Sequence, residues 1–508
     1  MLVIIDYCGK ISPSSWSGGD PSMMGQQAKG RQLKMFYQGL SLERRVRPDH
    51  PLRQVKQLVD FDFIYQEVAP CYGVNGHVSV PPPVILKLML LLVFYNVRSE
   101  RELMATLPER LDWLWFIDFD LDDQIPGHSV LSKARSRWGT AAFKHFFERI
   151  VWQCVAAGLV DGSKIFMDSS LIQADASKNS IINMNSLKSQ LNPHYQELEA
   201  RLEELPEDGK GQGQLNRTHL STTDPEASLV SKGKVRSQLS FKVHRAVDSR
   251  SEVITAAQVT SGAVNEGHLL PELIEQHTEN TQSQVEVVVA DSQYGTIKNY
   301  LECHDRGLKA HISPFRDAHR KNGRFSDEAF SYDPQDDVYL CLGGQRLKRT
   351  RYDRNREACQ YQGKAKICKA CSLRDKCTDS KTGRTLWRHL RQEEVRLMRD
   401  RAQSFRSKRD LRTRQHLMER SFARAVPLGF KRARWRRLWR VQIQEYLTAA
   451  IQNMMILVRY VKEPGTAISL AIKKAKDKWL NLPATCLALF TRKGPFPWAD
   501  CCGIVVPR

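Results

Sequence analysis

The sequence predicts an α/β protein with a mixed sheet as its core, an all-helical N-terminal domain and a small cysteine-rich insertion. Three observations predict this class. Short β-branched and apolar runs lead into Asp168 and again into Asp291. This pattern is typical of a buried strand with an acid at its end. Proline and serine signals mark successive helices before residue 145, as helix starts commonly do. Five cysteines gather between Cys341 and Cys377.

Shifts in composition and periodicity divide the chain into six expected regions. They are a disordered leader over 1–30, a helical domain over 31–145, the first part of the core over 146–314 with a charged insertion over 183–220, the cysteine-rich insertion over 315–395, the second part of the core over 396–463, and a variable tail over 464–508.

The N-terminal domain shows ordered helix signals. Pro51 begins a helix through Val59, and residues 81–83, three prolines, lead into an apolar helix that reaches Val97. That apolar run is shorter than the roughly 20 residues that a membrane span needs. Ser99 with Glu102 forms a capping box before the next helix. Residues 127–129 supply an N-cap for a basic helix that carries Lys133, Arg135 and Arg137.

The core elements follow in a fixed order. After the strand of Asp168, two apolar runs flank residues 248–251 as a hairpin. A helix is expected from Glu266 to about Gln276, then the strand that leads into Asp291, then a further helix and a strand at residues 310–313. This alternation of strands and helices favours a sheet that helices cover.

Two helices close the core after the insertion. The first carries Glu419 and is expected to stop before Pro427, because proline removes a backbone donor and clashes with the preceding turn. The second has an apolar stripe at helical spacing, expected to lie on the sheet. Its members are Ile443, Leu447, Ala450, Ile451, Met454 and Val458.

The charge predicts a polyanionic partner. The formal net charge is +21, and residues 399–440 alone carry 15 basic against three acidic side chains. Such a footprint is typical of proteins that bind nucleic acid. Candidate phosphate contacts there are Arg414, Arg420, Arg424, Lys431 and Arg432. The basic helix makes 31–145 a candidate DNA-binding domain, although a solvated basic surface explains Lys133, Arg135 and Arg137 equally well. Trp435 and Trp439 are read as packing residues rather than base-stacking ones.

Three acids on separate elements predict a metal centre. Asp168 and Asp291 each follow a strand run, and Glu419 lies on a helix. Oxygen ligands from separate elements suit Mg²⁺ or Mn²⁺, which combine a few carboxylates with water and phosphate oxygens. Taken singly, an aspartate after a strand is more often a turn former or a helix cap. The recurrence of the pattern favours the metal centre.

The cysteines predict a second, structural metal. The 12 cysteines of the chain are too dilute for a disulfide scaffold, and their cluster indicates metal binding in a reducing compartment. Cys368 and Cys371 form a half-site for zinc, which Cys377 and Cys341 complete. The alternatives are free thiols, or a site at which only three ligands converge.

An ordered set of motifs carries a resemblance to a family. VRPDHPLR, FMDSSLIQADAS, STTDPEASLV, SFKVHRAVDSRSEVI, VVVADSQYGT, MERSFARA and RVQIQEYLTAAIQNMMIL occur in this order over roughly residues 30–460. In this order they resemble the DDE transposases of bacterial insertion sequences, in the subgroup that has a cysteine-bearing insert before the catalytic glutamate. The resemblance implies an RNase H-like core with Asp168, Asp291 and Glu419 as catalytic residues.

The resemblance also implies an activity and its partners. Two Mg²⁺ or Mn²⁺ ions would serve DNA cleavage and strand transfer, acting on terminal inverted repeats and target DNA, in a homodimer within the bacterial cytoplasm at the nucleoid. One departure is Val426, where the family usually has a lysine. Two alternatives therefore stand beside an active transposase: an impaired, transposase-derived DNA-binding protein, and an RNase H-like nuclease that cuts without joining.

Overall fold

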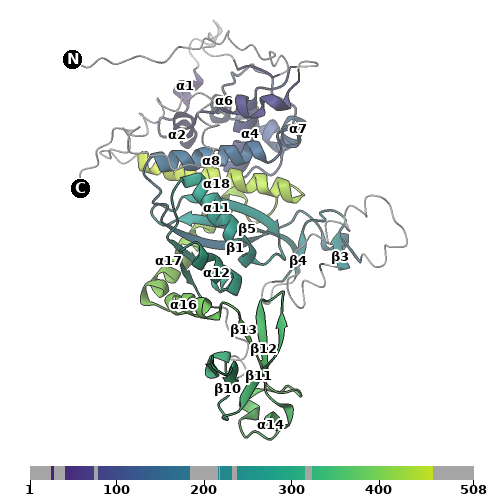
Figure 1. Cartoon of the computed structure of the whole chain (residues 1–508). Coiled ribbons are helices and arrows are strands. Elements are labelled where there is room, and N and C mark those ends of the chain that lie inside the picture. Colours follow the sequence, from purple (N-terminus) through teal and green to yellow (C-terminus); the bar gives the residue numbers. More distant parts are fainter. Residues whose placement is uncertain are drawn as a thin grey trace, which may run out of the picture.

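The computed structural model describes residues 24–27, 41–73, 78–183, 216, 218–231, 237–314 and 323–461. Most of the leader expected over 1–30, most of the insertion expected over 183–220, and the whole tail over 464–508 lie outside these residues. Figure 1 shows three layers along the molecule: helices of the N-terminal region, a central sheet, and a smaller sheet that projects from the far end.

The N-terminal region is helical, as predicted. Ser99 caps its helix by accepting the backbone N–H of Glu102 at 3.1 Å, whereas the expected cap at residues 127–129 makes no side-chain hydrogen bond. The apolar helix ends at Phe94, and Asn96 has a positive φ of 50° that turns the chain away. The helices are α1 (Leu42–Arg45), α2 (Pro51–Leu58), α3 (Ile64–Val68), α4 (Pro82–Phe94), α5 (Glu100–Thr106), α6 (Leu111–Ile117), α7 (Ser129–Trp138) and α8 (Ala141–Ala156), with 3₁₀ turns η2 (Ala69–Cys71) and η3 (Leu107–Glu109).

The central sheet is mixed. Its order is β4-β5-β1-β7-β8, and β6 pairs with β5. Strands β4 and β6 are antiparallel to β5, which is antiparallel to β1, whereas β7 and β8 continue parallel to β1 and to each other. Outside this sheet, β2 (Ile181–Asn183) pairs with β3 (His219–Ser221) after the turn η4 (Lys178–Ser180). The sheet strands are β1 (Lys164–Gln173), β4 (Ser228–Val230), β5 (Gln238–Asp248), β6 (Ile254–Ser261), β7 (Val287–Ala290) and β8 (Lys309–Ile312).

Strand β1 does not end at Asp168, contrary to the expectation from the sequence. It continues to Gln173 because β5 pairs with it from Ile165 to Gln173, with Asp168 opposite Arg245. On its other edge, β7 pairs only with residues 164–166. Asp168 therefore lies in mid-strand, at the point where the neighbouring parallel strand has stopped.

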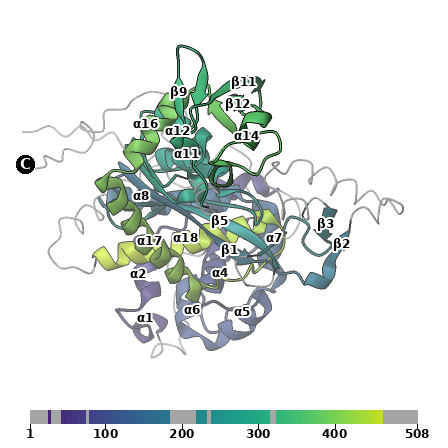
Figure 2. The ribbon, with the colours of Figure 1, turned by 90° about the horizontal axis from the view of Figure 1, so that it is seen from below.

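Helices cover both faces of the sheet. One face carries η6 (Glu266–Leu269), α11 (Leu270–Thr281), α12 (Ile297–Asp305) and α16 (Gln392–Ala402), whose apolar side chains share a core with Ile165 and Met167. The other face carries α17 (Phe405–Ala425) and α18 (Leu438–Val461). As predicted, α17 stops before Pro427, which lies in the turn η9 (Val426–Leu428). Figure 2 shows these layers from below.

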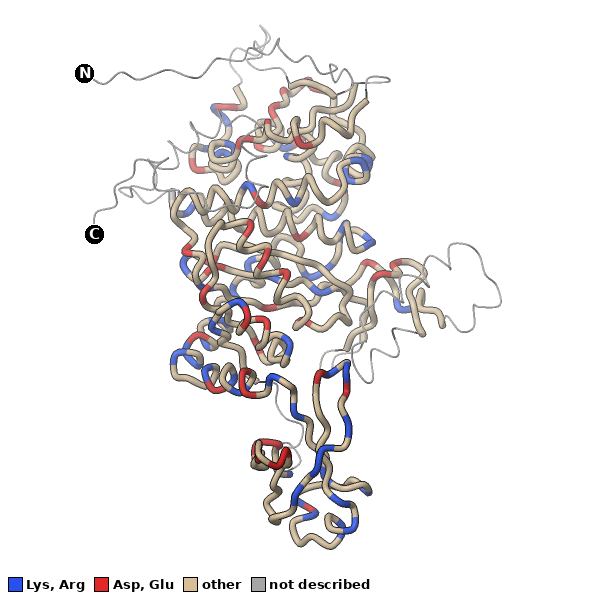
Figure 3. The backbone as a smooth tube through the Cα atoms, in the orientation of Figure 1, with Lys and Arg blue, Asp and Glu red and all other residues tan. Residues whose placement is uncertain are grey.

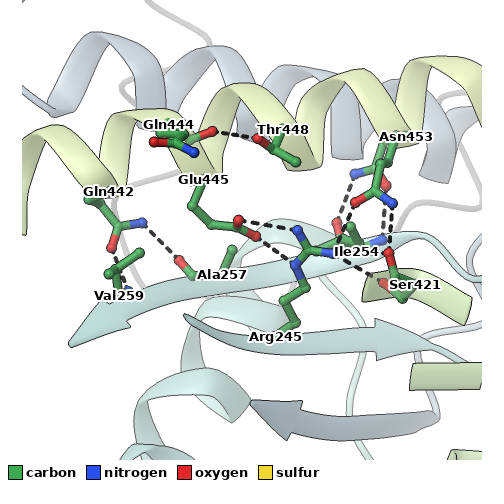
Figure 4. Close-up of polar contacts among 11 residues, drawn as sticks. Arg245, Ile254, Ala257, Val259, Ser421, Gln442, Gln444, Glu445, Thr448 and Asn453 are labelled. Carbon is green, nitrogen blue, oxygen red and sulfur yellow. Dashed lines mark hydrogen bonds and ion pairs between the residues drawn. The ribbon is translucent and has the colours of Figure 1, made fainter. Parts of the chain in front are cut away.

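Helix α18 lies between the N-terminal helices and the sheet (Figure 1), with contacts to α2, α4, α8 and β6. All six residues of its predicted apolar stripe are buried. The prediction for its contact with the sheet was incomplete, because the residues that bond to β5 and β6 are polar. Gln442 accepts the N–H of Val259 at 2.7 Å, and Asn453 accepts the N–H of Ile254 at 2.9 Å (Figure 4).

Arg245 of β5 is fully buried beneath these helices. It donates to Glu445 of α18 at 2.6 Å and 3.1 Å, to Gln452 at 2.9 Å, and to Ser421 of α17 at 3.3 Å (Figure 4). A single guanidinium thereby joins the central strand to both helices of this face.

The projecting unit holds a five-stranded antiparallel sheet of order β13-β12-β11-β10-β9. Its small core includes Leu347, Tyr361 and Leu386. The elements are η8 (Asp327–Ala329), β9 (Ser331–Asp333), β10 (Val338–Leu340), β11 (Arg346–Asp353), β12 (Ala358–Gln362), α14 (Ala365–Lys369), α15 (Arg374–Cys377) and β13 (Thr385–His389). Among the helices that are described, none is long and apolar enough to cross a membrane.

Candidate active site

The two predicted aspartates meet at one edge of the sheet. Phe166 of β1 pairs in parallel with Val289 of β7, so Asp168 and Asp291 lie two residues beyond the same rung of the ladder. Asp291 lies between the end of β7 at Ala290 and the turn η7 (Ser292–Tyr294). Each carboxylate is fixed locally, since Asp291 accepts the N–H of Gln293 at 2.9 Å and Asp168 accepts the N–H of Ser169 at 2.8 Å.

A third carboxylate joins them, and the sequence had not singled it out. One oxygen each of Asp168, Asp291 and Glu266 lies within 4.8 Å of the other two. Glu266 opens η6, a short distance after β6 ends at Ser261. The pattern used for the aspartates, an apolar run leading straight into an acid, misses it because the strand stops at Ser261 and the four residues 262–265 precede the acid. Its place between a strand end and a helix start was the available signal.

Glu419 is not in this group. It is exposed on α17, and its Oε1 accepts from Gln415 at 3.2 Å. Its helix is nevertheless at the site, because Arg414 of α17 donates to Asp168 at 2.7 Å. Glu419 lies five positions after Arg414, which is roughly 7.5 Å along a helix axis. The structure thus places α17, the helix that carries Glu419, beside the aspartates. The role of Glu419 as a catalytic residue remains a prediction.

Burial and like charge govern the acids of the site. Burial, which disfavours the charged form, raises the pKa of Asp168 to about 6; Arg414 opposes this rise, and the charges of Asp291 and Glu266 add to it. The pKa of Asp291 is raised as well, first by burial and then by Glu266. Arg414 pairs with Asp168, and Lys242 lies 3.5 Å from Glu266, so each of these cations compensates one acid of the group. Such crowded carboxylates are suited to holding divalent cations.

The predicted phosphate contacts of the α17 region lie in several settings. Arg420 and Arg424 both pair with Glu252, which Arg424 approaches at 2.7 Å. Lys431 is exposed, and Arg432 is exposed with an ion pair to Asp175 at 2.8 Å. Lys and Arg residues recur along α16 and α17 and along the projecting sheet (Figure 3). Arg414 is committed to Asp168 rather than to solvent.

The three basic residues predicted on the N-terminal helix also lie in different environments. Lys133 and Arg137 are exposed on α7. Arg135, in contrast, is 4% exposed, pairs with Glu100 and lies 4.0 Å from the centre of the Trp435 ring. Its predicted role as a surface contact is therefore replaced by a packing role. Trp435 and Trp439 pack against the large helical core, as expected.

The cysteines lie in the projecting unit. A Cβ at Gly343 would stand 3.8 Å from the sulfur of Cys341 and 3.6 Å from that of Cys371, so both thiols flank one turn. Gln345 donates its backbone N–H to the Cys341 sulfur at 3.3 Å. The pKa of the Cys377 thiol is raised by burial and then by Cys368, Cys341 and Cys371, although Arg384 opposes the rise. The described groups that converge within 4.8 Å do not include these thiols.

Comparisons with known proteins give three results. One family model, Transposase domain (DUF772), matches residues 40–137, and a second, Transposase DDE domain, matches residues 340–458. No curated protein matches the chain. A solved structure, the piggyBac transposase synaptic complex with hairpin DNA, is similar with a TM-score of 0.33 and 8% identity, over 92% of this chain and 89% of the other. The two family matches flank the strands that carry the aspartates.

Proposed function

We propose that this chain is a DDE transposase, which the two transposase family models over residues 40–137 and 340–458 support. In this proposal it binds the ends of a mobile element and catalyses DNA cleavage and strand transfer at the site of Asp168 and Asp291. The observation that carries the proposal is the convergence of Asp168, Asp291 and Glu266 within 4.8 Å at one edge of the sheet. The strand order, with β7 and β8 parallel to β1 beside an antiparallel hairpin, supports an RNase H-like core.

The donor set fits divalent ions. It consists of carboxylate oxygens, which Mg²⁺ and Mn²⁺ prefer, and its shared repulsion falls when a cation is bound. Two such ions would activate the attacking oxygen and stabilise the leaving oxygen of the phosphodiester. In our proposal Asp168 and Asp291 hold the ions, and Glu419 on α17 serves as the third catalytic acid when DNA is bound.

The chain's own residues have further tasks in this reaction. Arg414 donates to Asp168 at 2.7 Å and compensates its charge while no cation is bound. Lys431, Arg432, Lys133 and Arg137 are exposed cations that would bind DNA phosphates and place the scissile bond, because phosphate contacts fix the register of a protein on DNA. Joining of two element ends requires two copies of the site, which supports a homodimer in the synaptic complex.

A second candidate function is DNA binding without cleavage. Glu419 lies outside the carboxylate group, and Val426, at the position of the usual lysine, is 40% exposed without a charge. Both observations favour an impaired copy. Restoring the lysine with Val426→Lys should then raise cleavage of element ends above that of the natural chain. A nuclease that cuts without joining would give cleaved ends but no strand-transfer product.

The test is cleavage of labelled DNA that carries the element's own ends, with Mg²⁺, by the full chain. Asp168→Ala and Asp291→Ala should abolish cutting and retain end binding in a gel-shift assay. Glu275→Gln is the matched control, because Glu275 is an exposed acid paired with Arg306 on the outside of α11. Normal cutting by Asp291→Ala would overturn the proposed site.

A further inference from the structure

Glu266 is held at the aspartates by a specific local structure. Asn265 caps η6 by accepting the N–H of Gly267 at 3.0 Å. Asn299 then donates to the carbonyls of both Gly267 and Tyr294 at 2.9 Å, which ties η6 to the turn that follows Asp291. The approach is close, since a Cβ at Gly267 would stand 3.1 Å from the carbonyl oxygen of Gln293. These hydrogen bonds therefore hold η6, and with it Glu266, next to the turn that follows Asp291.

Tyr294 supplies an independent observation at the same place. Its side chain is fully buried, and its hydroxyl has no hydrogen-bond partner among the described residues. Tyr294 ends the turn that begins after Asp291, and its backbone N–H donates to the Asp291 carbonyl at 3.2 Å. It lies within electrostatic reach of Glu266, Asp168 and Asp291. A buried donor beside three carboxylates is ready to bond to one of them or to a group that they bind.

An ion pair alone does not account for this arrangement. Lys242 lies 3.5 Å from Glu266 and donates to the carbonyl of Val264 at 2.9 Å, so it compensates one negative charge. It leaves the mutual repulsion of the three carboxylates, one oxygen of each of which lies within 4.8 Å of the other two. A divalent cation shared by these carboxylates would remove that repulsion.

We propose that Glu266 is a further metal-binding residue of this site, acting with Asp291 and Asp168, and that the Tyr294 hydroxyl is a hydrogen-bond donor within it. This inference rests on the proposed function, because it assigns an additional ligand to the same centre. It also assigns cation binding and the third catalytic acid to different residues. Glu266 belongs to the cation site that exists without DNA, and Glu419 of α17 is the third catalytic acid.

The test is a titration of the full chain, free of DNA, with Mn²⁺ followed by electron paramagnetic resonance. Glu266→Gln should weaken Mn²⁺ binding at least about tenfold, because affinity follows the count of charged ligands. Tyr294→Phe should weaken it by about tenfold as well, which is typical of groups that support ligands. Glu266→Asp, which keeps the charge, should recover part of the loss, and Glu275→Gln should bind like the natural chain.

Two further variants make the outcome decisive. Lys242→Met should keep or strengthen Mn²⁺ binding if Glu266 is a ligand; a loss equal to that of Glu266→Gln would show that the ion pair only supports the fold and would overturn the inference. Asp291→Asn tests the site itself. If Asp291→Asn loses Mn²⁺ and Glu266→Gln binds normally, only this inference fails. If both bind normally, the proposed metal centre fails as well. Thermal unfolding of each metal-free variant checks that it is folded.

Discussion

Arg414 and Asp168 are far apart in the chain, but the Arg414 guanidinium donates a hydrogen bond of 2.7 Å to the Asp168 carboxylate. The guanidinium occupies one oxygen of the carboxylate that we assign to metal binding. Helix α17 is thereby linked directly to the strand at the centre of the sheet. The contact makes Arg414 a competitor of any cation that binds Asp168.

Replacing Arg414 should therefore tighten metal binding. In Arg414→Met the charge that pairs with Asp168 is absent, and Mn²⁺ affinity should rise by about three- to tenfold, the size of a single screened charge interaction. The measurement is the same Mn²⁺ titration, with Arg412→Met on the exposed side of α17 as the control. Weaker binding by Arg414→Met would mean that Arg414 mainly orders the carboxylate.

Glu419→Gln should separate metal binding from catalysis. Because Glu419 is exposed and outside the carboxylate group, the variant should bind Mn²⁺ like the natural chain in the absence of DNA. It should nevertheless lose cleavage of element ends, if α17 supplies the third catalytic acid. Full cleavage by Glu419→Gln would assign the third acid elsewhere, with Glu266 the first candidate.

Metal binding should depend on pH near 6. The pKa of Asp168 in the metal-free fold is about 6, above the 3.8 of an unperturbed aspartate. Its contribution to the unfolding free energy is therefore fully present below pH 4 and is lost as the pH rises through 6. The ionised form is the one that binds a cation. Mn²⁺ affinity should thus increase between pH 5 and pH 7, and calorimetry at several pH values measures it; a flat profile would contradict the shift.

Breaking the buried pair of Arg245 and Glu445 should destabilise the whole chain. Both side chains are 0% exposed, so Glu445→Gln leaves a buried guanidinium without its charge partner. The expected loss is about 3–5 kcal/mol of unfolding free energy, measured by urea denaturation. The control is Glu275→Gln, whose exposed pair with Arg306 should be worth at most about 1 kcal/mol. Equal losses from the two variants would refute this ranking.

The cysteine prediction has its own measurement. If Cys341, Cys368, Cys371 and Cys377 bind zinc, elemental analysis of the reduced, purified chain should find one zinc per molecule. Cys371→Ser should lose most of it, because a structural site closes with four ligands. Cys303→Ser, a buried thiol on α12, is the control. A zinc content near zero in the natural chain would leave these residues as free thiols.

The sequence predicted those features that depend on local patterns. Runs of valine before Asp291, proline at helix starts and the stop before Pro427 each act within a few residues, and their elements are present. The adjacency of Asp168 and Asp291 followed from two such runs. The projecting sheet was not foreseen, because its strands are short and carry many charges, which hides the alternation that marks a strand.

The failed predictions depended on distant partners. Arg135 reads as a surface cation until Glu100 and Trp435, which enclose it, are in place. For α18 the sequence predicted only the apolar stripe, and the contact of Glu445 with Arg245, two hundred residues away, was not foreseen. Such contacts have no local signature, because a buried charge is explained only by the partner that compensates it.

Helix α18 has a consequence for the synthesis of the chain. Its residues complete the core around α4 and α8, yet about 300 residues separate the end of α8 from the end of α18. At the usual rates of translation, roughly 5–20 residues per second, the early helices wait about 15–60 s for their partner. During that time their apolar faces are accessible to chaperones and proteases. A truncated product that lacks α18 should therefore be degraded rather than persist as a free N-terminal fragment.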